Sequence, residues 1–134
     1  VLAFLMPIVA SMGGNAGMQT LAVTIRTLAT NDLTKNNFTD SILKEFNIGI
    51  LNGIIFAIIS AIIVQIWFQD YLLSMIISIS MVLTMIIAGL FGILVPVTLK
   101  NFDIDPAIAS GVFVTTITDV IGFLSFLGVA AYFL

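Results

Sequence analysis

IGILNGIIFAIISAIIVQIWF, residues 48–68, is the stretch that decides the fold. It contains 21 residues and no charged side chain. As an α-helix it would extend about 31 Å, which matches the hydrocarbon thickness of a bilayer. The stretch therefore predicts a transmembrane helix.

Three further segments also predict membrane helices. The first is the least regular, because Pro7 and a glycine-rich stretch interrupt it. The third is long enough to tilt or protrude, and Pro96 predicts a kink near its end. The last follows Asp105-Pro106, which is typical of an N-cap and a proline in the first turn. The expected fold class is an all-α membrane protein in one domain (1–134), a bundle of four helices over residues 1–29, 48–68, 72–99 and 106–134.

Composition supports a membrane protein. The chain is 60% hydrophobic and only 8% charged, with a mean hydropathy of +1.25. A soluble domain carries about 25% charged residues, so this surface must face lipid. Four Lys and Arg residues in total make a nucleic-acid-binding face a poor expectation.

The charged residues predict the orientation. The basic residues all fall on one side of the predicted threading: Arg26, Lys35, Lys44 and Lys100. The positive-inside rule then places the connections 30–47 and 100–105 in the cytoplasm and the C-terminus outside. The remaining connection is a tight turn at Gln69-Asp70. The second half of 30–47 is mildly amphipathic, which predicts a short helix at the membrane interface.

The chain has neither histidine nor cysteine. Any metal site must therefore use oxygen ligands, which suit hard cations such as Mg²⁺ and Ca²⁺. Catalysis fits poorly, because intramembrane aspartyl chemistry needs two carboxylates that share a proton. The last segment contains only one, so we expect a protein that is not an enzyme.

That carboxylate is Asp119, near the middle of an apolar segment with no other charge. Inserting it at mid-membrane costs roughly 2.5–3.5 kcal/mol on translocon scales. Thr115 shares its helical face and Thr116 lies near it. Intramembrane carboxylates usually mark ion or proton pathways, and we expect a cation to offset the cost. The alternative is a protonated or internally paired Asp119, with threonines bonded to their own helix.

A second polar group follows from residues 13–20, GGNAGMQT. Its three glycines weaken a helix by about 1 kcal/mol each relative to alanine. Asn15 and Gln19 are four residues apart and share a face if the segment is helical. Two interpretations stay open: a tightly packed helix interface, or a pore-lining element beside a water-filled path.

Two other glycine pairs have a simpler interpretation. Gly49 with Gly53, and Gly89 with Gly92, have the small-residue spacing of closely packed membrane helices. We predict close packing at both pairs and no chemistry.

The motifs resemble those of the MgtE magnesium transporters and their eukaryotic solute-carrier relatives. Pro7, then GNAGMQ at 14–19 and Arg26, resembles the second transmembrane helix of that family. DPA at 105–107, followed by ASG at 109–111 and TTITD at 115–119, resembles its fifth helix. The resemblance covers essentially the whole chain.

The resemblance implies a homodimer with a pore along the subunit interface. Asp119 would face the Mg²⁺ path opposite its symmetry mate, and Asp105 would lie near a cytoplasmic gate where Mg²⁺ also binds. Mg²⁺ would thus be both the transported and a bound ion. The protein would be a multi-pass component of a bacterial inner membrane. The pore-lining positions implied are Gly14, Asn15, Gly17, Gln19, Gly111, Thr115 and Thr116.

Members of this family have five transmembrane helices, and four are visible here. Val1 stands inside an apolar stretch with no features of a signal peptide. We therefore expect a fragment that lacks the first helix and the cytoplasmic regulatory domains.

Three hypotheses follow for the function. The first is a channel that passes Mg²⁺ down its electrochemical gradient. The second is a secondary transporter that exchanges a divalent cation for Na⁺ or H⁺, with Asp119 as the coupling site. The third is a non-conducting scaffold whose polar residues only join helices.

Overall fold

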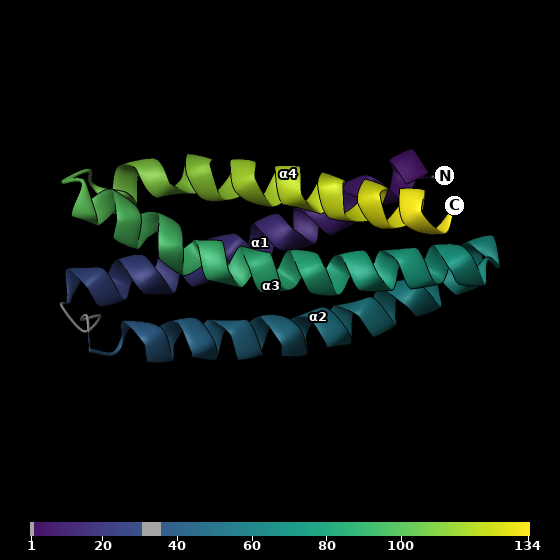
Figure 1. The fold of residues 1–134 in the computed structure, drawn as a ribbon, viewed down its shortest axis with the longest axis horizontal. Helices are drawn as coiled ribbons and strands as arrows, with labels where there is room; N and C mark the ends of the chain where they lie inside the picture. Colours follow the sequence, from purple (N-terminus) through teal and green to yellow (C-terminus); the bar gives the residue numbers. More distant parts are fainter. Residues whose placement is uncertain (1, 31–35) are drawn as a thin grey trace.

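The computed structural model describes residues 2–30 and 36–134, which form four long helices. Figure 1 shows them side by side as a bundle, with the amino end of α1 and the carboxyl end of α4 at the same end. The all-helical class and the number of helices agree with the sequence prediction. The helices are α1 (Leu2–Ala29), α2 (Phe38–Phe68), α3 (Tyr71–Asn101) and α4 (Pro106–Phe133).

Helix α2 begins ten residues earlier than predicted, at Phe38 instead of residue 48. The predicted separate interfacial helix is wrong, because this segment continues directly into the membrane helix. No glycine or proline lies between Phe38 and Ile48 to end a helix, and Asp40 is in the first turn, where an acid favours the helix dipole. At 31 residues, α2 is about 46 Å long and exceeds the hydrocarbon core.

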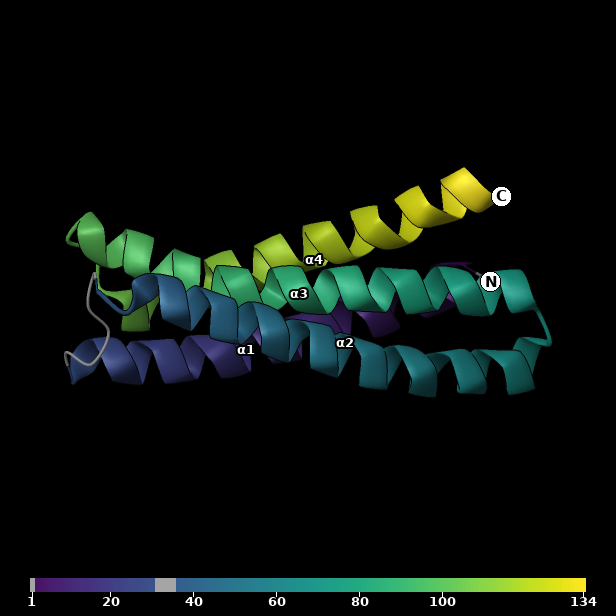
Figure 2. The ribbon, with the colours of Figure 1, turned by 60° about the horizontal axis from the view of Figure 1, so that its bottom comes forward.

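Helix α3 is the centre of the bundle. The other three helices all pack against it, and α1 also packs against α4. In the most apolar stretch of α3, 56% of the residues are buried, against 22% in α2 and in α4. In Figure 2, α4 diverges from α3 toward its carboxyl end. Lipid would therefore contact α2 and α4 much more than α3.

By length and composition, three helices of the described chain can cross a membrane: α2, α3 and α4. Helix α2 exposes a row of isoleucines, among them Ile58, Ile62 and Ile66. Helix α1 is long enough at 28 residues but is interrupted by polar side chains such as Asn15 and Gln19. Its low apolar content separates it from the other three.

Glycines let the helices approach closely, as predicted. A Cβ atom on Gly49 would lie 2.9 Å from the Cα atom of Ile86, and one on Gly53 would lie 2.9 Å from that of Val82. On Gly92, a Cβ atom would lie 2.6 Å from Cβ of Thr20. Distances under 3 Å leave no room for a side chain, so these glycines fix the spacing of α1, α2 and α3.

The ends of the helices agree with the turn and cap predictions. Gln69 adopts a left-handed conformation (φ +52°), and Asp70 caps α3 by accepting hydrogen bonds from the Leu72 and Leu73 amides at 3.0 and 3.3 Å. Pro96 lies inside α3, which curves near its carboxyl end in Figure 1. This turn and Asp70 lie at the end of the bundle opposite the connections of α1 to α2 and of α3 to α4.

Replacing Gly49 by alanine should destabilise the protein by about 1–3 kcal/mol, because the added methyl group meets α3 backbone that cannot move aside cheaply. Thermal unfolding of the full-length protein in detergent, followed by size-exclusion chromatography, measures the change. Gly128→Ala is the matched control, since a Cβ atom there meets nothing within 4 Å. Equal midpoints for both variants would contradict close packing at Gly49.

Candidate functional site

Asp119 lies in the interior of α4, 13 residues beyond Pro106 and thus about 20 Å along the helix. Its side chain is half-buried within the chain. No hydrogen bond or ion pair joins it to any residue of the described ranges 2–30 and 36–134. Arg26 is exposed in the last turn of α1 and does not pair with it. Arg26 therefore does not neutralise this carboxylate.

The threonines around Asp119 divide between two faces of α4. Thr118 is fully buried and donates a hydrogen bond to the Thr115 carbonyl at 3.0 Å. Thr115 and Thr116 are exposed, and the Thr115 hydroxyl lies 3.8 Å from Sδ of Met18 on α1. Thr118 is thus a threonine bonded to its own helix, as one of the two alternatives expected. Thr115 and Asp119 share the less buried face of α4.

The glycine-rich part of α1 packs against α3 and α4. A Cβ atom on Gly17 would lie 2.9 Å from Cγ1 of Val114, and one on Gly13 would lie 2.5 Å from Cγ2 of Thr84. Gly14 is less crowded, because a Cβ atom on it would lie 3.9 Å from Oγ1 of Thr118. Tight helix packing therefore applies at Gly13 and Gly17. A pore-lining role for Gly14 and Gly17 stays a prediction.

The polar side chains of the same segment point outward. Asn15 and Gln19 are exposed, and Asn15 lies about one turn from Met18, which contacts α4. Cε of Met18 lies 3.7 Å from the position of a Cβ atom on Gly111. We call this surface the α1–α4 seam, and it comprises Asn15, Met18, Gly111, Thr115 and Asp119.

The pairing of the two helices sets the level of Asp119. Helices α1 and α4 run in opposite directions, with Met18 beside Thr115 and Ala10 beside Gly122. Asp119 lies between those two contacts, one turn beyond Thr115. It is therefore nearly level with Asn15, three residues before Met18. The structure thus brings four of the predicted residues together along this seam: Asn15, Gly111, Thr115 and Asp119. Thr116 is exposed on α4, and Gln19 is exposed on α1.

Asp105 is separate from this group. It is the N-cap of α4, is exposed, and accepts a hydrogen bond from the Ala107 amide at 3.0 Å. Fourteen residues of helix place it about 21 Å from the level of Asp119. The two carboxylates therefore cannot bind one ion together within a single chain.

Within the described residues, no group of three or more His, Cys, Asp or Glu side chains converges. Asp119 is the only carboxylate of α4. A hard cation beside it would need water or a carboxylate from elsewhere for its remaining ligands.

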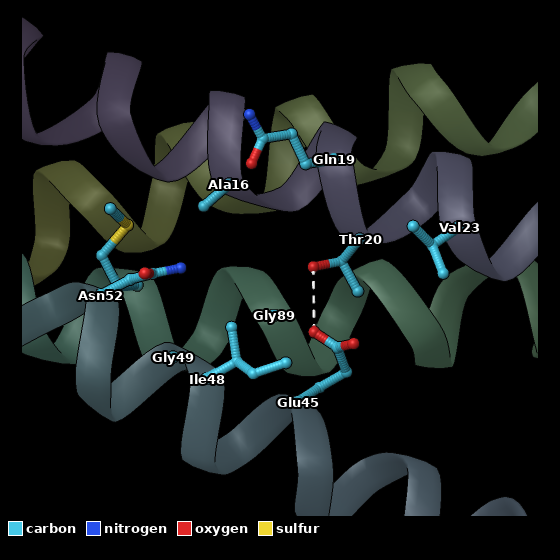
Figure 3. A pocket seen from close by; sticks show the side chains of 10 residues that line it. Ala16, Gln19, Thr20, Val23, Glu45, Ile48, Gly49, Asn52 and Gly89 are labelled. Atoms are coloured by element: carbon cyan, nitrogen blue, oxygen red, sulfur yellow. Dashed lines mark hydrogen bonds between the residues drawn. The ribbon is translucent and has the colours of Figure 1, made fainter.

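Sequence reasoning missed a cavity between α1, α2 and α3 whose lining includes polar side chains. Its volume is about 160 Å³. The Thr20 hydroxyl donates a hydrogen bond of 3.2 Å to Oε2 of Glu45 beside it (Figure 3). Asn52 and Gln19 also line this cavity. The prediction failed because Glu45 was assigned to a connection. Extending the helical period back from Asn52 through Gly49 would have placed Glu45 on the same face.

Comparison with known proteins identifies relatives along almost the whole chain. The family model named MgtE, a divalent cation transporter, matches residues 6–129. The chain is 38% identical to the magnesium transporter MgtE of Bacillus subtilis (strain 168) over 133 residues, 99% of this chain and 30% of that protein. It is 34% identical to the protein of that name from Enterococcus faecalis over 134 residues, 100% of this chain and 30% of that protein. A third, from Thermus thermophilus, is 34% identical over 129 residues, 96% of this chain and 28% of that protein. The chain thus spans less than a third of the curated relatives it matches.

Asp105 can be tested as a helix cap. Asp105→Ala should lower the stability of the full-length protein by about 1 kcal/mol, because the Ala107 amide loses its acceptor. Asp105→Asn should lose much less, since asparagine caps nearly as well as aspartate. Thermal unfolding without divalent cations measures both. Equal losses would mean that the charge of Asp105, and not the cap, stabilises this end of α4.

Proposed function

Because the chain belongs to the MgtE family of divalent cation transporters, we propose that it is part of a protein that moves Mg²⁺ across a membrane. In this proposal Mg²⁺ passes down its electrochemical gradient through a pore between two copies of the chain. The α1–α4 seam of each copy lines the pore.

The observation that carries this proposal is Asp119. It is the only charged residue of α4, it has no partner among the described residues, and it lies on a face that α1 leaves partly open. A lone carboxylate at this depth costs several kcal/mol unless a charge offsets it. A permeating cation supplies that charge without a protein cation.

The chemistry of Mg²⁺ fits a seam of this kind. Mg²⁺ requires octahedral oxygen ligands and gives up water reluctantly, so it usually keeps several waters beside one or two carboxylates. Two Asp119 side chains across a dimer axis would balance one divalent ion. Asn15 and Thr115 would form hydrogen bonds with the waters that Mg²⁺ keeps. In this proposal the ion therefore passes largely hydrated. Gly14, Gly17, Gln19, Gly111 and Thr116 would complete the lining.

The distribution of charge supports an orientation. Among the described residues, Arg26, Lys44 and Lys100 lie toward the end where α4 begins, whereas Asp70 lies at the opposite end; Lys35 falls outside the described residues. We assign the basic end to the cytoplasm and the C-terminus to the outside. Helix α1 then also crosses the membrane, and Asp105 lies at the cytoplasmic mouth, near a gate.

The cell's own potential would drive influx in this orientation. A double charge gains about 4.6 kcal/mol per 100 mV, inside negative, which is twice the single-charge value. The named relatives are bacterial proteins, which supports a bacterial inner membrane as the location. Such a membrane carries a potential of this sign. No counter-ion is then needed, and we favour a channel over an exchanger.

Asp119→Asn in the full-length protein should reduce Mg²⁺ uptake at least tenfold, because it removes the charge and leaves the side-chain volume nearly unchanged. Mg²⁺ entry into proteoliposomes, measured with an internal fluorescent indicator, gives the rate. Asp70→Asn is the matched control, since it removes the same charge at a helix cap where asparagine substitutes well. Unchanged uptake by a folded, dimeric Asp119→Asn protein would remove Asp119 from the mechanism and favour the scaffold hypothesis.

The channel and exchanger mechanisms differ in their driving force. With equal pH and Na⁺ on both sides, a potential of −100 mV set by K⁺ and valinomycin should drive Mg²⁺ uptake through a channel. Uptake should also reverse direction when the potential is reversed. Strict dependence on a Na⁺ or proton gradient, with no response to potential, would instead establish exchange.

A further inference from the structure

Helices α1 and α2 are joined at one point. Within Leu2–Ala29 and Phe38–Phe68, which are fully described, the bond from the Thr20 hydroxyl to Glu45 is the only hydrogen bond between the two helices. Helix α2 otherwise packs against α3. The direct contact between α1 and α2 therefore depends on this bond, while each helix packs separately against α3.

Both partners of the bond pack against glycines of α3. Thr20 lies over Gly92, where a Cβ atom would come within 2.6 Å of the threonine Cβ. The backbone carbonyl of Glu45 lies over Gly89, 3.2 Å from the corresponding position. Any side chain at either glycine would push α1 or α2 away. The three helices thus meet at a junction of Thr20, Glu45, Gly89 and Gly92.

Glu45 at this junction is next to water-sized space on two sides. It lines the cavity of about 160 Å³ shown in Figure 3 and a second cavity of about 150 Å³ toward the connection between α1 and α2. Either is large enough to hold several waters, and each lining combines polar and apolar side chains. Lys44 lines the second cavity, yet no ion pair joins Glu45 to any described residue. The Thr20 hydroxyl is therefore the one hydrogen-bond partner that the described residues give the Glu45 side chain.

The bond acts on the part of α1 that belongs to the proposed pore. Gln19 precedes Thr20 directly, and Asn15 lies little more than one helical turn away. Because a helix turns as a rigid body, rotation at Thr20 changes the direction of both amides. A change at Glu45 would therefore alter the direction of these side chains, although Glu45 does not contact the ion.

We propose that Glu45 is a positioning residue: by accepting the Thr20 hydroxyl, it fixes the rotation of α1 and so the direction of Asn15 and Gln19. The inference rests on the proposed function for its effect on transport. Its structural part, the control of α1 by Glu45, does not. Glu45 acts as a hydrogen-bond acceptor, not as a charge that attracts the ion.

Two pairs of substitutions in the full-length protein test this role. Glu45→Met and Thr20→Val each remove one partner and nearly keep side-chain size, and each should lower Mg²⁺ uptake about tenfold, as expected for a lost hydrogen bond to a charged group. Glu45→Gln and Thr20→Ser keep an acceptor and a donor, and uptake should stay within about twofold of the parent. The double variant Thr20→Val/Glu45→Met should be no slower than either single variant, because both remove the same interaction.

A reporter on α1 gives a readout that does not depend on transport. The chain has no cysteine, so Gln19→Cys places a single thiol beside the junction, with any cysteine elsewhere in the full-length protein replaced. Its rate of modification by a membrane-impermeant thiosulfonate should change at least fivefold in Glu45→Met and Thr20→Val, and stay near the parent rate in Glu45→Gln and Thr20→Ser. Size-exclusion chromatography checks folding of every variant.

Several results would overturn the proposal. A Glu45→Gln variant as slow as Glu45→Met, with an unchanged thiol rate, would show that the charge matters and not the acceptor. Multiplying effects in the double variant would show that the two residues act separately. If the parent protein moves no Mg²⁺, the proposed function fails, and the thiol rates still decide whether Glu45 positions α1.

Discussion

The close approach of helix backbones to α3 is the constraint on which the rest of the structure depends. In lipid, apolar side chains gain little by leaving one hydrocarbon surface for another, so helices associate through van der Waals contact and hydrogen bonds. Gly49, Gly53 and Gly92 provide that contact, since each leaves room for the backbone or side chain of a neighbouring helix. Helix α3 is consequently buried on most sides, and α1, α2 and α4 take their positions from it.

Two carboxylates, Glu45 and Asp119, have different surroundings in this arrangement. Glu45 lies where three helices meet, bonded to Thr20 and bordered by cavities. Asp119 lies on the outward seam, with no partner among the described residues. The first is suited to hold helices in place, and the second is suited to a charge that comes from outside the chain. Both roles belong to our proposals, and they act through the same helix, α1.

Much of the fold followed from simple patterns. An uncharged run of membrane length, an Asp-Pro pair and a Gln-Asp turn predicted the helices near residues 48–68, 72–99 and 106–134 with small errors at most ends. The early start of α2 was missed, because charged residues between Phe38 and Ile48 suggested a connection although nothing there ends a helix. Glu45 was lost as a site residue for the same reason. The candidate site residues were predicted from residue type and spacing. The burial of Thr118 and Gly17 comes from the packing of α1 against α4, which residue type and spacing do not indicate.

The sequence by itself determined that the chain is a helical membrane protein, that any metal site in it must use oxygen ligands, and that Asp119 is the only charge on its own helix. These follow from composition and local period, which need no partner segment. Only the tertiary structure decided which face of each helix is buried, that Asn15 and Asp119 share a level, and that Thr20 meets Glu45 25 residues later. Those facts depend on the rotation and depth of one helix against another. Contacts between helices set that rotation, and no pattern within a single helix contains it.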